Sequence, residues 1–268
     1  MKILITGSSG FVGKHLVNLL SKKHQIVEYD LVNGQDVLDE KLLTSKLLGV
    51  DLVIHLAAFI SATESWDKPM EYMRNNTLGT LSVVTCGVKA GVKKMIFFSS
   101  AAVKSSPLTP YAVSKINAER ILELYKDKIN IVVVRPENIY GPGQKANYGY
   151  VIHNFIKSTK NGEPVMIYGD GNQTRDFIYV DDVVNTVEKL TVLNIKTGTV
   201  VSLGTSKEIR IVDLARKVMK VLDKKTEVNF LEARNEPLKS VADVGNLNEL
   251  GINPGKFLSL EEGIKKLI

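Results

Sequence analysis

A glycine-rich segment directly after the first apolar run limits the folds open to this chain. Residues Lys2–Thr6 (KILIT) are a short, fully apolar strand candidate, and Phe11–Ser21 has the period of an amphipathic helix. Gly7 permits a tight turn between them, Gly10 lets a phosphate approach bare backbone, and Gly13 allows the helix to pack closely on the strand. The N–H groups at the start of such a helix bind phosphates. The segment therefore predicts a dinucleotide site at the end of the first strand.

Asp30 follows the second strand candidate, Gln25–Tyr29, and lies 17 residues beyond Gly13. A ribose-binding acid is expected roughly 20 residues after a glycine loop of this kind. A carboxylate there accepts hydrogen bonds from the ribose hydroxyls and repels a 2′-phosphate, so Asp30 favours NAD over NADP. A turn aspartate at the strand end is the alternative. Asp36 and Val37 lie where an adenine edge would be held, although a solvated loop acid accounts for Asp36 nearly as well.

Short apolar runs alternate with helix-period segments along the first half of the chain. Three of these runs have no polar alternation: Asp51–Leu56, Met95–Ser99 and Asn130–Arg135. Such strands are buried on both faces of a mostly parallel sheet. Helices are expected at Pro69–Ala90 and Pro110–Tyr125, and Asp181 or Asp182 is expected to cap a later one. The pattern predicts an α/β fold with a doubly wound, mostly parallel Rossmann sheet.

The regular alternation of apolar runs and helix-period segments ends at about residue 140. Three further short strands are predicted at Pro164–Tyr168, Thr199–Leu203 and Thr226–Leu231. The predicted NAD-binding Rossmann domain comprises residues 1–138 and about 176–205. The predicted small substrate-binding domain comprises residues about 139–175 and 206–268.

The net positive charge is compatible with an anionic partner but does not identify which kind. Lys and Arg number 35 against 29 Asp and Glu, a net charge of +6. A nucleic acid, an anionic membrane face and a phosphorylated small molecule would all suit it. The lysines form dispersed pairs that are not interleaved with aromatic residues: Lys22-Lys23, Lys93-Lys94, Lys224-Lys225 and Lys265-Lys266. Solvated surface is therefore the better interpretation of these pairs, and no nucleic-acid partner is expected.

Metal, disulfide and membrane chemistry are also disfavoured. The single cysteine, Cys86, excludes an intrachain disulfide and a cysteine-based metal cluster. The four histidines have no metal-ligand spacing, and His55 is expected to be a satisfied core residue. No apolar run approaches the roughly 18 residues of a membrane-spanning helix, and no secretory leader precedes the first strand. A cytoplasmic protein with no membrane partner and no metal is therefore expected.

Tyr111 and Lys115 are four residues apart in a predicted helix and so share one face. An ammonium close to a phenol stabilises the phenolate and lowers the pKa of the tyrosine. Such a tyrosine takes a proton from a sugar or alcohol hydroxyl while hydride leaves the carbon. Ser99 and Ser100 end the preceding strand, and ligands bind at the carboxyl ends of the strands in sheets of this type.

Motifs along the whole chain resemble the short-chain dehydrogenase/reductase superfamily, and more narrowly its extended branch of NAD-dependent nucleotide-sugar epimerases and dehydratases. These motifs are Thr6–Gly13, His55–Ala58, Asn75–Thr80, Ser100, Tyr111 with Lys115, Arg135–Gly143, Arg175–Asp182, Ala242-Asp243 and Leu260–Ile264. The resemblance is strongest to enzymes like UDP-glucose 4-epimerase. It implies an NAD cofactor, a nucleotide-sugar substrate and a homodimer formed through the helices at 69–90 and 110–125.

The resemblance also implies residue roles. Ser100 would hydrogen-bond the reacting oxygen, with Ser99 as a less favoured substitute. Tyr111 would be the catalytic acid/base, and Lys115 would hold the nicotinamide ribose. The predicted cofactor contacts are Gly7, Gly10, Phe11, Val12, Gly13, Asp30, Asp36, Val37, Leu56, Ala57, Ala58, Asn76, Ser99, Tyr111 and Lys115.

Substrate contacts are implied for Ser100 and for four residues beyond position 135. Asn138 would contact the sugar nucleotide, and Tyr168 would stack on its base. Arg175 and Arg234 resemble arginines that bind the substrate diphosphate, a task suited to bidentate donors. A surface salt bridge is the alternative role for these two arginines.

The residues after Ser100 bear on the reaction. Related 4,6-dehydratases and decarboxylases carry an Asp-Glu pair there, whereas this chain has Ala101-Ala102-Val103. The resemblance therefore implies C4 epimerisation of a nucleotide-diphosphate sugar, with UDP-glucose and UDP-galactose favoured, through a transient 4-keto intermediate. The interval from Ser100 to Tyr111 is short, however, so an NAD(P)-dependent reductase of a nucleotide-linked 4-keto sugar is the alternative. A non-catalytic nucleotide sensor or an RNA-binding protein is a remote one, because the Tyr/Lys pair is retained.

Overall fold

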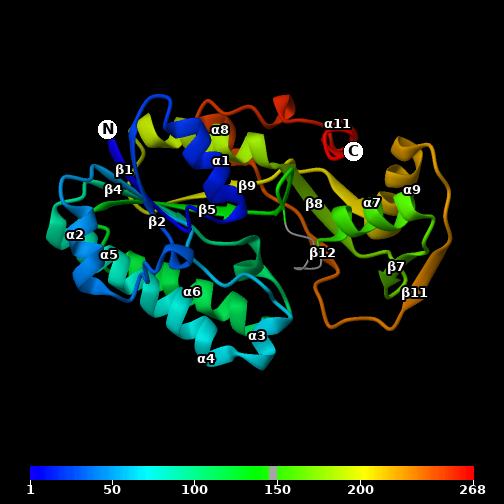
Figure 1. Ribbon diagram of the computed structural model, residues 1–268, viewed down its shortest axis with the longest axis horizontal. Helices are drawn as coiled ribbons and strands as arrows, with labels where there is room; N and C mark the ends of the chain where they lie inside the picture. The colour runs from blue at the N-terminus through cyan, green and yellow to red at the C-terminus, as the bar shows by residue number, and fades with distance from the viewer. Residues whose placement is uncertain (145–149) are drawn as a thin grey trace. The chain divides into compact units, whose positions relative to one another are not determined.

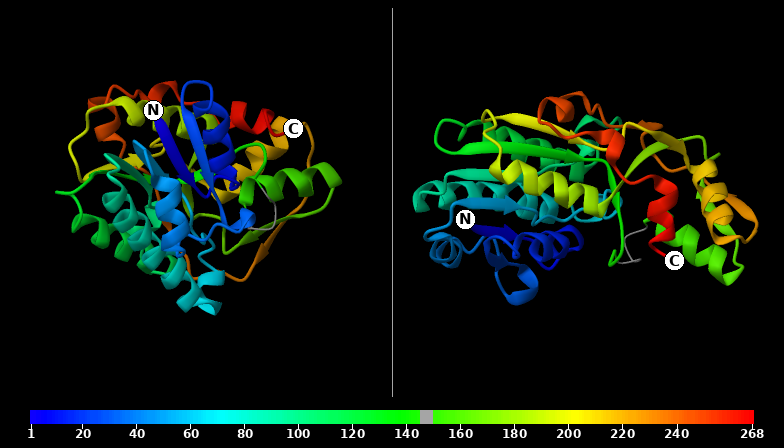
Figure 2. Two further views of the ribbon diagram at one scale, coloured as in Figure 1. Left: turned by 60° about the vertical axis from the view of Figure 1, so that its left-hand side comes forward. Right: turned by 90° about the horizontal axis from the view of Figure 1, so that it is seen from above.

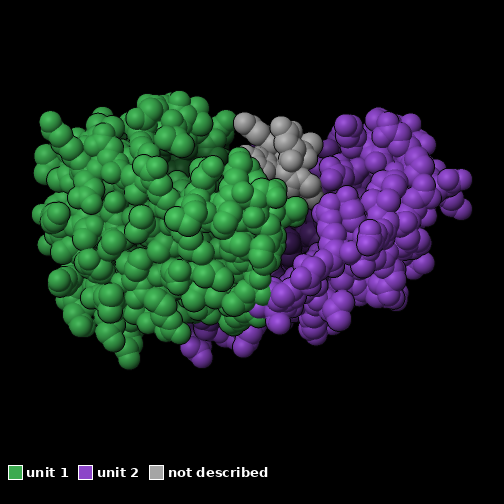
Figure 3. All heavy atoms as spheres, turned by 90° about the horizontal axis from the view of Figure 1, so that it is seen from below, with its two compact units in different colours: residues 1–104, 108–135, 184–201 green, residues 105–107, 136–183, 202–268 purple. Residues whose placement is uncertain are grey.

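The computed structural model describes residues 1–144 and 150–268. The chain divides into two compact units, which have separate colours in Figure 3. Unit 1 comprises Met1–Lys104, Leu108–Arg135 and Val184–Val201, and unit 2 comprises Ser105–Pro107, Pro136–Val183 and Ser202–Ile268. These bounds differ from the predicted domain bounds at residues 105–107, 136–138, 176–183 and 202–205, which lie in unit 2. The assignment of cofactor and substrate to separate domains stays a prediction.

Unit 1 contains a six-stranded sheet with the order β2-β1-β3-β4-β5-β9. Its strands are β1 (Lys2–Thr6), β2 (Gln25–Tyr29), β3 (Leu52–His55), β4 (Lys94–Phe98), β5 (Asn130–Pro136) and β9 (Thr199–Leu203). The pairs β1/β2, β1/β3, β3/β4 and β4/β5 are parallel. The predicted Rossmann sheet is confirmed, with strand ends within one residue of those expected. Because β2 and β3 lie on opposite sides of β1, the chain changes direction at the carboxyl end of β1, where such sheets bind ligands.

Helices cover both faces of this sheet (Figures 1 and 2). They are α1 (Phe11–Leu20), α2 (Glu40–Leu47), α3 (Glu64–Asp67), α4 (Pro69–Tyr72), α5 (Gly79–Ala90), α6 (Pro110–Glu123) and the later part of α8 (Val180–Val192). Figure 1 shows α2, α5 and α6 side by side on one face, and α1 and α8 on the other. Apolar side chains of the sheet and of α2, α5 and α6 form a buried core that includes Leu43, Val53, Val84, Phe97 and Leu122. Burial of these side chains is the main stabilising contribution in this layer.

The predicted helix at Pro69–Ala90 is not a regular α-helix. Between α4 and α5 the backbone widens into a π-helical segment, η2 (Met73–Leu78). A π-turn accommodates one extra residue without ending the helix, and such turns are frequent at functional sites. Here it holds the predicted cofactor residue Asn76, which is 1% exposed.

Unit 2 is built from short strands, two helices of 11 and 12 residues and two shorter helices, within the described residues. One sheet contains β6 (Asn138–Tyr140), β8 (Thr174–Tyr179), β10 (Glu208–Arg210) and β12 (Lys239–Ser240), and β7 (Val165–Tyr168) pairs in parallel with β11 (Val228–Leu231). The helices are α7 (Val151–Asn161), α9 (Ile211–Leu222), α10 (Gly245–Glu249) and α11 (Leu260–Lys265). The strands expected at 164–168 and 226–231 are confirmed, each with a later start.

The predicted cap of α8 is wrong by two or three residues, because the residue that precedes the helix is Tyr179. Strand β8 ends at Tyr179 and α8 begins at Val180, so no loop separates them. Asp181 and Asp182 therefore lie inside the first helical turn, where negative charge still interacts favourably with the helix dipole. The Asp182 carboxylate accepts a hydrogen bond from the Leu258 amide at 2.9 Å, and burial raises its pKa.

Within the described part of the chain, no helix is long and apolar enough to cross a membrane. The same residues contain no group of three or more His, Cys, Asp or Glu side chains arranged to hold a metal ion.

Candidate active site

The glycine loop between β1 and α1 has the close contacts that its sequence predicts. Gly7 has a φ of 71°, and a Cβ at this position would lie 2.8 Å from the Ala57 nitrogen. A Cβ on Gly13 would lie 2.1 Å from the Gly7 carbonyl oxygen. Both positions therefore exclude any other residue. Gly10 is the N-cap of α1 and supplies no side-chain cap, so the first amides of this helix are available to phosphate oxygens.

The Asp30 carboxylate lies beside this loop. One oxygen accepts a hydrogen bond from the Ser9 amide at 2.8 Å, and the other accepts from the Val32 amide at 3.0 Å. Each carboxylate oxygen has a further lone pair, so the group is still able to accept from the two hydroxyls of a ribose. The uncapped helix start, the bare glycine backbone and this acceptor together fit a dinucleotide without a 2′-phosphate.

The predicted adenine contacts, Asp36 and Val37, are held in place from two sides. The Asp36 carboxylate accepts from the Leu38 amide at 2.9 Å, and its carbonyl accepts from the Tyr29 hydroxyl at 2.8 Å. Val37 is buried against the start of α5, where a Cβ on Gly79 would lie 2.8 Å from its side chain. Their contact with adenine stays a prediction.

Tyr111 and Lys115 project from the first two turns of α6. Thr109 fixes the start of this helix, because its side chain accepts a hydrogen bond from the Ala112 amide. Tyr111 is 8% exposed, and its ring makes an edge contact with Tyr72 at a centroid distance of 6.3 Å. Lys115 is 3% exposed, and its ammonium donates to the Phe98 carbonyl, at the end of β4, at 2.8 Å. Burial lowers the pKa of Lys115 to about 7, whereas the nearby carboxylate of Glu119 acts in the opposite direction.

The two candidate serines have different partners. The Ser99 hydroxyl donates to the Glu119 carboxylate at 2.5 Å, and the same carboxylate forms a two-point ion pair with Arg135. The Ser100 hydroxyl accepts from the Ala102 amide at 3.1 Å and keeps its hydrogen for another acceptor. Glu119 was not predicted as a site residue, although its position one helical turn after Lys115 places it on the face that carries Tyr111 and Lys115.

Asn76 contacts α6. Its amide nitrogen donates to the Ser114 hydroxyl and to the Phe59 carbonyl, both at 2.9 Å, and its oxygen accepts from the Phe59 amide at 2.8 Å. The Ser114 hydroxyl then donates to the Tyr111 carbonyl at 2.7 Å. Asn76 therefore helps to fix the backbone of α6, and its contact with the cofactor stays a prediction.

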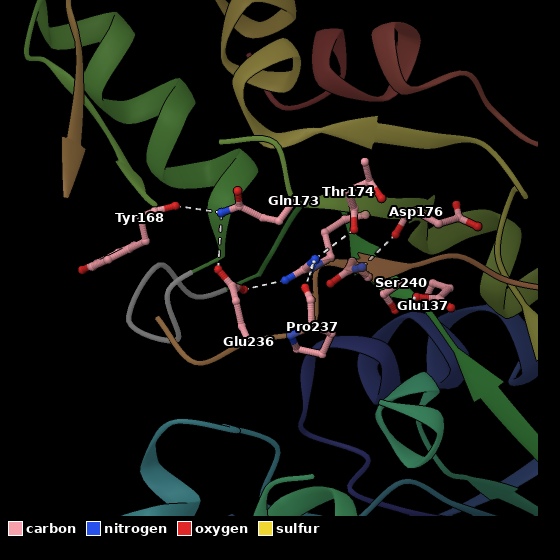
Figure 4. A network of polar contacts seen from close by, with 10 residues as sticks. Glu137, Tyr168, Gln173, Thr174, Asp176, Glu236, Pro237 and Ser240 are labelled. Atoms are coloured by element: carbon pink, nitrogen blue, oxygen red, sulfur yellow. Dashed lines mark hydrogen bonds and ion pairs between the residues drawn. The ribbon is translucent and has the colours of Figure 1, made fainter. Parts of the chain in front are cut away.

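In unit 2, Arg175 is already paired. Its guanidinium forms an ion pair with Glu236 at 2.5 Å and donates to the Pro237 carbonyl at 2.8 Å, while its side chain is 12% exposed. Gln173 donates to the Tyr168 carbonyl at 2.8 Å and lies near the same glutamate (Figure 4). These contacts connect the segment at 234–237 to β8, which no sequence motif had indicated.

The other predicted substrate residues lie around this network. The Arg234 guanidinium lies 3.3 Å from the centroid of the Tyr168 ring, and the tyrosine is 36% exposed. Asn138 is exposed on β6 and donates to the Asp176 carbonyl at 2.8 Å. The fully buried Asp176 carboxylate accepts hydrogen bonds from three backbone amides and one hydroxyl, supplied by Thr205, Ser206 and Ala242.

Comparison with known proteins identifies the family. Residues 3–204 match the NAD dependent epimerase/dehydratase family. The chain belongs to this family. A putative UDP-glucose 4-epimerase of Methanocaldococcus jannaschii is 31% identical over 304 residues, which cover 99% of this chain and 97% of the relative. Since this chain has only 268 residues, more than thirty positions of that alignment have no counterpart here.

Solved structures of the family agree with the fold. A UDP-glucose 4-epimerase of Thermotoga maritima with UDP-glucose has a TM-score of 0.92 and 29% identity, covering 99% of this chain and 97% of that one. A UDP-glucuronic acid 4-epimerase of Bacillus cereus, in complex with UDP-glucuronic acid and NAD, has a TM-score of 0.87 and 29% identity at the same coverage. This protein is therefore an NAD-dependent enzyme of the nucleotide-sugar epimerase/dehydratase family, and NAD is its cofactor.

Proposed function

We propose that this enzyme interconverts the C4 epimers of a UDP-sugar, with UDP-glucose and UDP-galactose as the first substrates to test. The main support for this proposal is the segment directly after Ser100. Residues Ala101–Lys104 form a short 3-10 helix that supplies no carboxylate. Dehydration or decarboxylation needs further acid and base groups beyond the Tyr/Lys pair. The residues present suit a reaction confined to oxidation and reduction at C4.

The proposed mechanism uses three side chains. The Tyr111 phenolate takes the proton of the C4 hydroxyl, while Ser100 donates its hydrogen to the same oxygen. When bound, NAD would supply the acceptor for the C4 hydride and, in its reduced form, the donor for the return step. Tyr111 gives the proton back to the oxygen once the 4-keto sugar has presented its other face. The positive charge of the Lys115 ammonium favours the phenolate form of Tyr111.

The partners of the two serines support Ser100 over Ser99 in this mechanism. The Ser99 hydrogen is donated to Glu119, whose carboxylate is held in turn by Arg135. A hydroxyl that already donates to a carboxylate is a poor donor to a sugar oxygen. Ser100 has its hydrogen available for the C4 oxygen.

The nucleotide part of the substrate is assigned to unit 2. Tyr168 is the proposed platform for the uracil ring, and Arg175 and Arg234 are the proposed partners of the diphosphate. Arginine suits this task because its planar fork binds two phosphate oxygens at once. Since Arg175 is paired with Glu236, the diphosphate would compete with that carboxylate for the guanidinium.

Reduction of a nucleotide-linked 4-keto sugar is the second candidate. Only ten residues separate Ser100 from Tyr111, and this chain lacks more than thirty positions of its aligned relative. A reductase does not require the 4-keto sugar to present its other face within the site. Such an enzyme would carry out the hydride step once and then exchange its cofactor.

One experiment separates the two candidates. Purified protein with stoichiometric NAD is incubated with UDP-glucose, UDP-galactose, their N-acetyl analogues or UDP-glucuronic acid, and the sugars are followed by NMR. Interconversion of one epimeric pair without net NADH supports the epimerase. Turnover of none of them, together with reduction of a 4-keto sugar by NADH, would replace it with the reductase. Tyr111→Phe should bind NAD with unchanged affinity and lose turnover, and full activity of this variant would refute the acid/base assignment.

We also propose a homodimer formed through the helices around α4 and α6. Met70 on α4 is 78% exposed, Trp66 on α3 is 60% exposed, and Leu124, directly after α6, is 77% exposed. A second copy that covered these helices would remove such side chains from water. Light scattering should give the mass of a dimer, and Leu124→Glu should shift it toward the monomer. A monomeric wild-type protein with full activity would contradict the proposal.

A further inference from the structure

We propose that His55 is a positioning residue. Hydrogen bonds through its imidazole connect the glycine loop to the Asn76 carbonyl, and the Asn76 side chain continues this chain of contacts to the start of the Tyr111–Lys115 helix. Every residue in this chain lies in unit 1. The inference rests on the proposed function for the roles of Tyr111 and Lys115, and on the family resemblance for the contact of Lys115 with the nicotinamide ribose.

The first half of the chain runs from the glycine loop to the imidazole. The Ala57 amide, which lies against Gly7, donates to the Thr6 hydroxyl at 3.2 Å. The Thr6 hydroxyl lies 2.7 Å from His55 Nδ1. Thr6 is the last residue of β1 and His55 the last of β3, so this bond joins the two strand ends that frame the loop.

The second half runs from the imidazole to α6. His55 Nε2 lies 3.0 Å from the Thr80 hydroxyl, which donates to the Asn76 carbonyl at 2.7 Å. The side-chain amide of Asn76 then donates to Ser114, and Ser114 donates to the Tyr111 carbonyl. The chain therefore ends on the backbone of the acid/base residue.

The hydrogens in this chain have only one consistent arrangement. Because the Thr80 hydrogen is donated to the Asn76 carbonyl, Thr80 accepts from His55, and Nε2 must carry the ring hydrogen. Nδ1 then has no hydrogen and accepts from Thr6, whose oxygen in turn accepts from the Ala57 amide. The structure thus selects one neutral tautomer of His55.

The surroundings of His55 keep it neutral. The side chain is 1% exposed, and its ring stacks on Phe97 at a centroid distance of 5.7 Å. The Lys115 ammonium lies over the same Phe97 ring at 5.0 Å from its centroid. Burial, with the charge of Lys115 as the second cause, lowers the pKa of His55 to about 3. A buried polar chain of this kind is stable only while each member keeps its partner, so removal of one link affects the groups on both sides.

The two ends of the chain would hold different parts of the cofactor. The glycine loop and Asp30 suit the adenosine diphosphate half of NAD, and Lys115 on α6 suits the nicotinamide ribose. A break on the Thr80 side should therefore weaken NAD binding without affecting ADP, which lacks the nicotinamide ribose. A break on the Thr6 side should weaken both ligands.

Two substitutions of His55 break the chain at different points. In His55→Asn, the shorter side chain places its oxygen near the Nδ1 position, where it accepts from Thr6 but does not reach Thr80. In His55→Gln, the longer side chain places its amide nitrogen near the Nε2 position, where it donates to Thr80 but loses Thr6. Calorimetric titration should show about a tenfold loss of NAD affinity in His55→Asn with ADP affinity within twofold of wild type. In His55→Gln, the affinities for NAD and ADP should fall by the same factor.

Threonine variants provide matched controls. Thr80→Val should reproduce the selective loss of NAD affinity seen in His55→Asn. Thr191→Val removes another buried hydroxyl of unit 1, one that bonds only within its own helix. It should leave the ratio of NAD to ADP affinity unchanged. Equal losses of NAD and ADP affinity in His55→Asn and Thr80→Val, or no loss in either, would overturn the inference.

The tautomer is tested on the wild-type protein, so the result does not depend on the folding of any variant. Nitrogen-15 NMR of the His55 ring should show a hydrogen on Nε2 and none on Nδ1 from pH 5 to pH 8. A hydrogen on Nδ1, or protonation of the ring within this range, would overturn the proposed direction of the chain. Neither measurement uses a sugar substrate. A wild-type protein that fails to epimerise any sugar would therefore refute the proposed function and leave this inference to be judged on its own results.

Discussion

Lys115 makes the stability of this protein depend on pH in a direction that follows from its burial. Folding lowers the pKa of its ammonium from the ordinary 10.5 to about 7. The native state therefore binds this proton more weakly than the unfolded state does. Between about pH 7 and pH 10.5 the unfolded state holds one more proton at this site, so the free energy of unfolding rises with pH. Below pH 7 both states are charged, and the cost of burying the charge is present in full.

The size of the effect follows from the pKa difference. Within this window each pH unit contributes about 1.4 kcal/mol. Between pH 7.5 and pH 9.0 the native state should gain about 2 kcal/mol from Lys115. Lys115→Met removes the titrating group and leaves an unbranched apolar side chain in its place. The unfolding free energy of wild type minus that of Lys115→Met should therefore increase by about 2 kcal/mol over this range.

Urea unfolding of the cofactor-free protein, followed by circular dichroism at several pH values, measures this difference. NAD is left out because its binding would itself stabilise the native state. Lys89→Met, at an exposed position of α5, is the control, and it should change stability little. If the difference in unfolding free energy between wild type and Lys115→Met did not change with pH, the reasoning would be refuted. Lys115 would then bind its proton equally strongly in the native and the unfolded state.

Three further substitutions test other parts of the molecule. Gly13→Ala should abolish NAD binding and lower Tm, since the new Cβ would lie 2.1 Å from the Gly7 oxygen; wild-type NAD affinity in calorimetry would contradict this. Asp176→Asn should lower the unfolding free energy by about 2–3 kcal/mol, since an amide NH2 would face three backbone amides that now donate to a carboxylate; an unchanged thermal transition would show that these bonds contribute nothing. Glu236→Gln should increase UDP affinity several-fold, since Arg175 loses an anionic partner. An unchanged Kd for UDP would show that Arg175 does not bind the diphosphate.

The parts of the site predicted from sequence are those whose chemistry is local. Gly7 and Gly13 are recognisable because a tight turn and a close helix–strand contact exclude a Cβ, whatever the rest of the fold does. Tyr111 and Lys115 are recognisable because helical periodicity alone places them on one face. The strand boundaries of the sheet were predicted to within one residue, since continuous apolar runs have few other uses in an α/β protein.

Predictions failed or were incomplete where backbone geometry depends on neighbouring elements. The stretch from Pro69 to Ala90 has a continuous helical pattern, but Asn76 bonds to the segment at Phe59 and to α6, and the backbone there widens into a π-turn. Asp181 and Asp182 looked like caps because they precede an amphipathic pattern. The helix instead begins at Val180, directly after β8.

The sequence by itself determined the Rossmann sheet, the glycine loop with Asp30, and the Tyr/Lys pair, because each is encoded in a pattern along the chain: apolar runs, the spacing of glycines and an acid at a strand end, or a helical spacing. Only the tertiary structure decided which partners the polar side chains have. In the tertiary structure the Ser99 hydroxyl donates to Glu119, 20 residues away, and Arg175 forms an ion pair with Glu236, 61 residues away. It also placed His55 between Thr6 and Thr80 and so selected one tautomer. Side-chain hydrogen bonds and ion pairs of this kind are set by which chain segments pack together, and no local pattern encodes that packing.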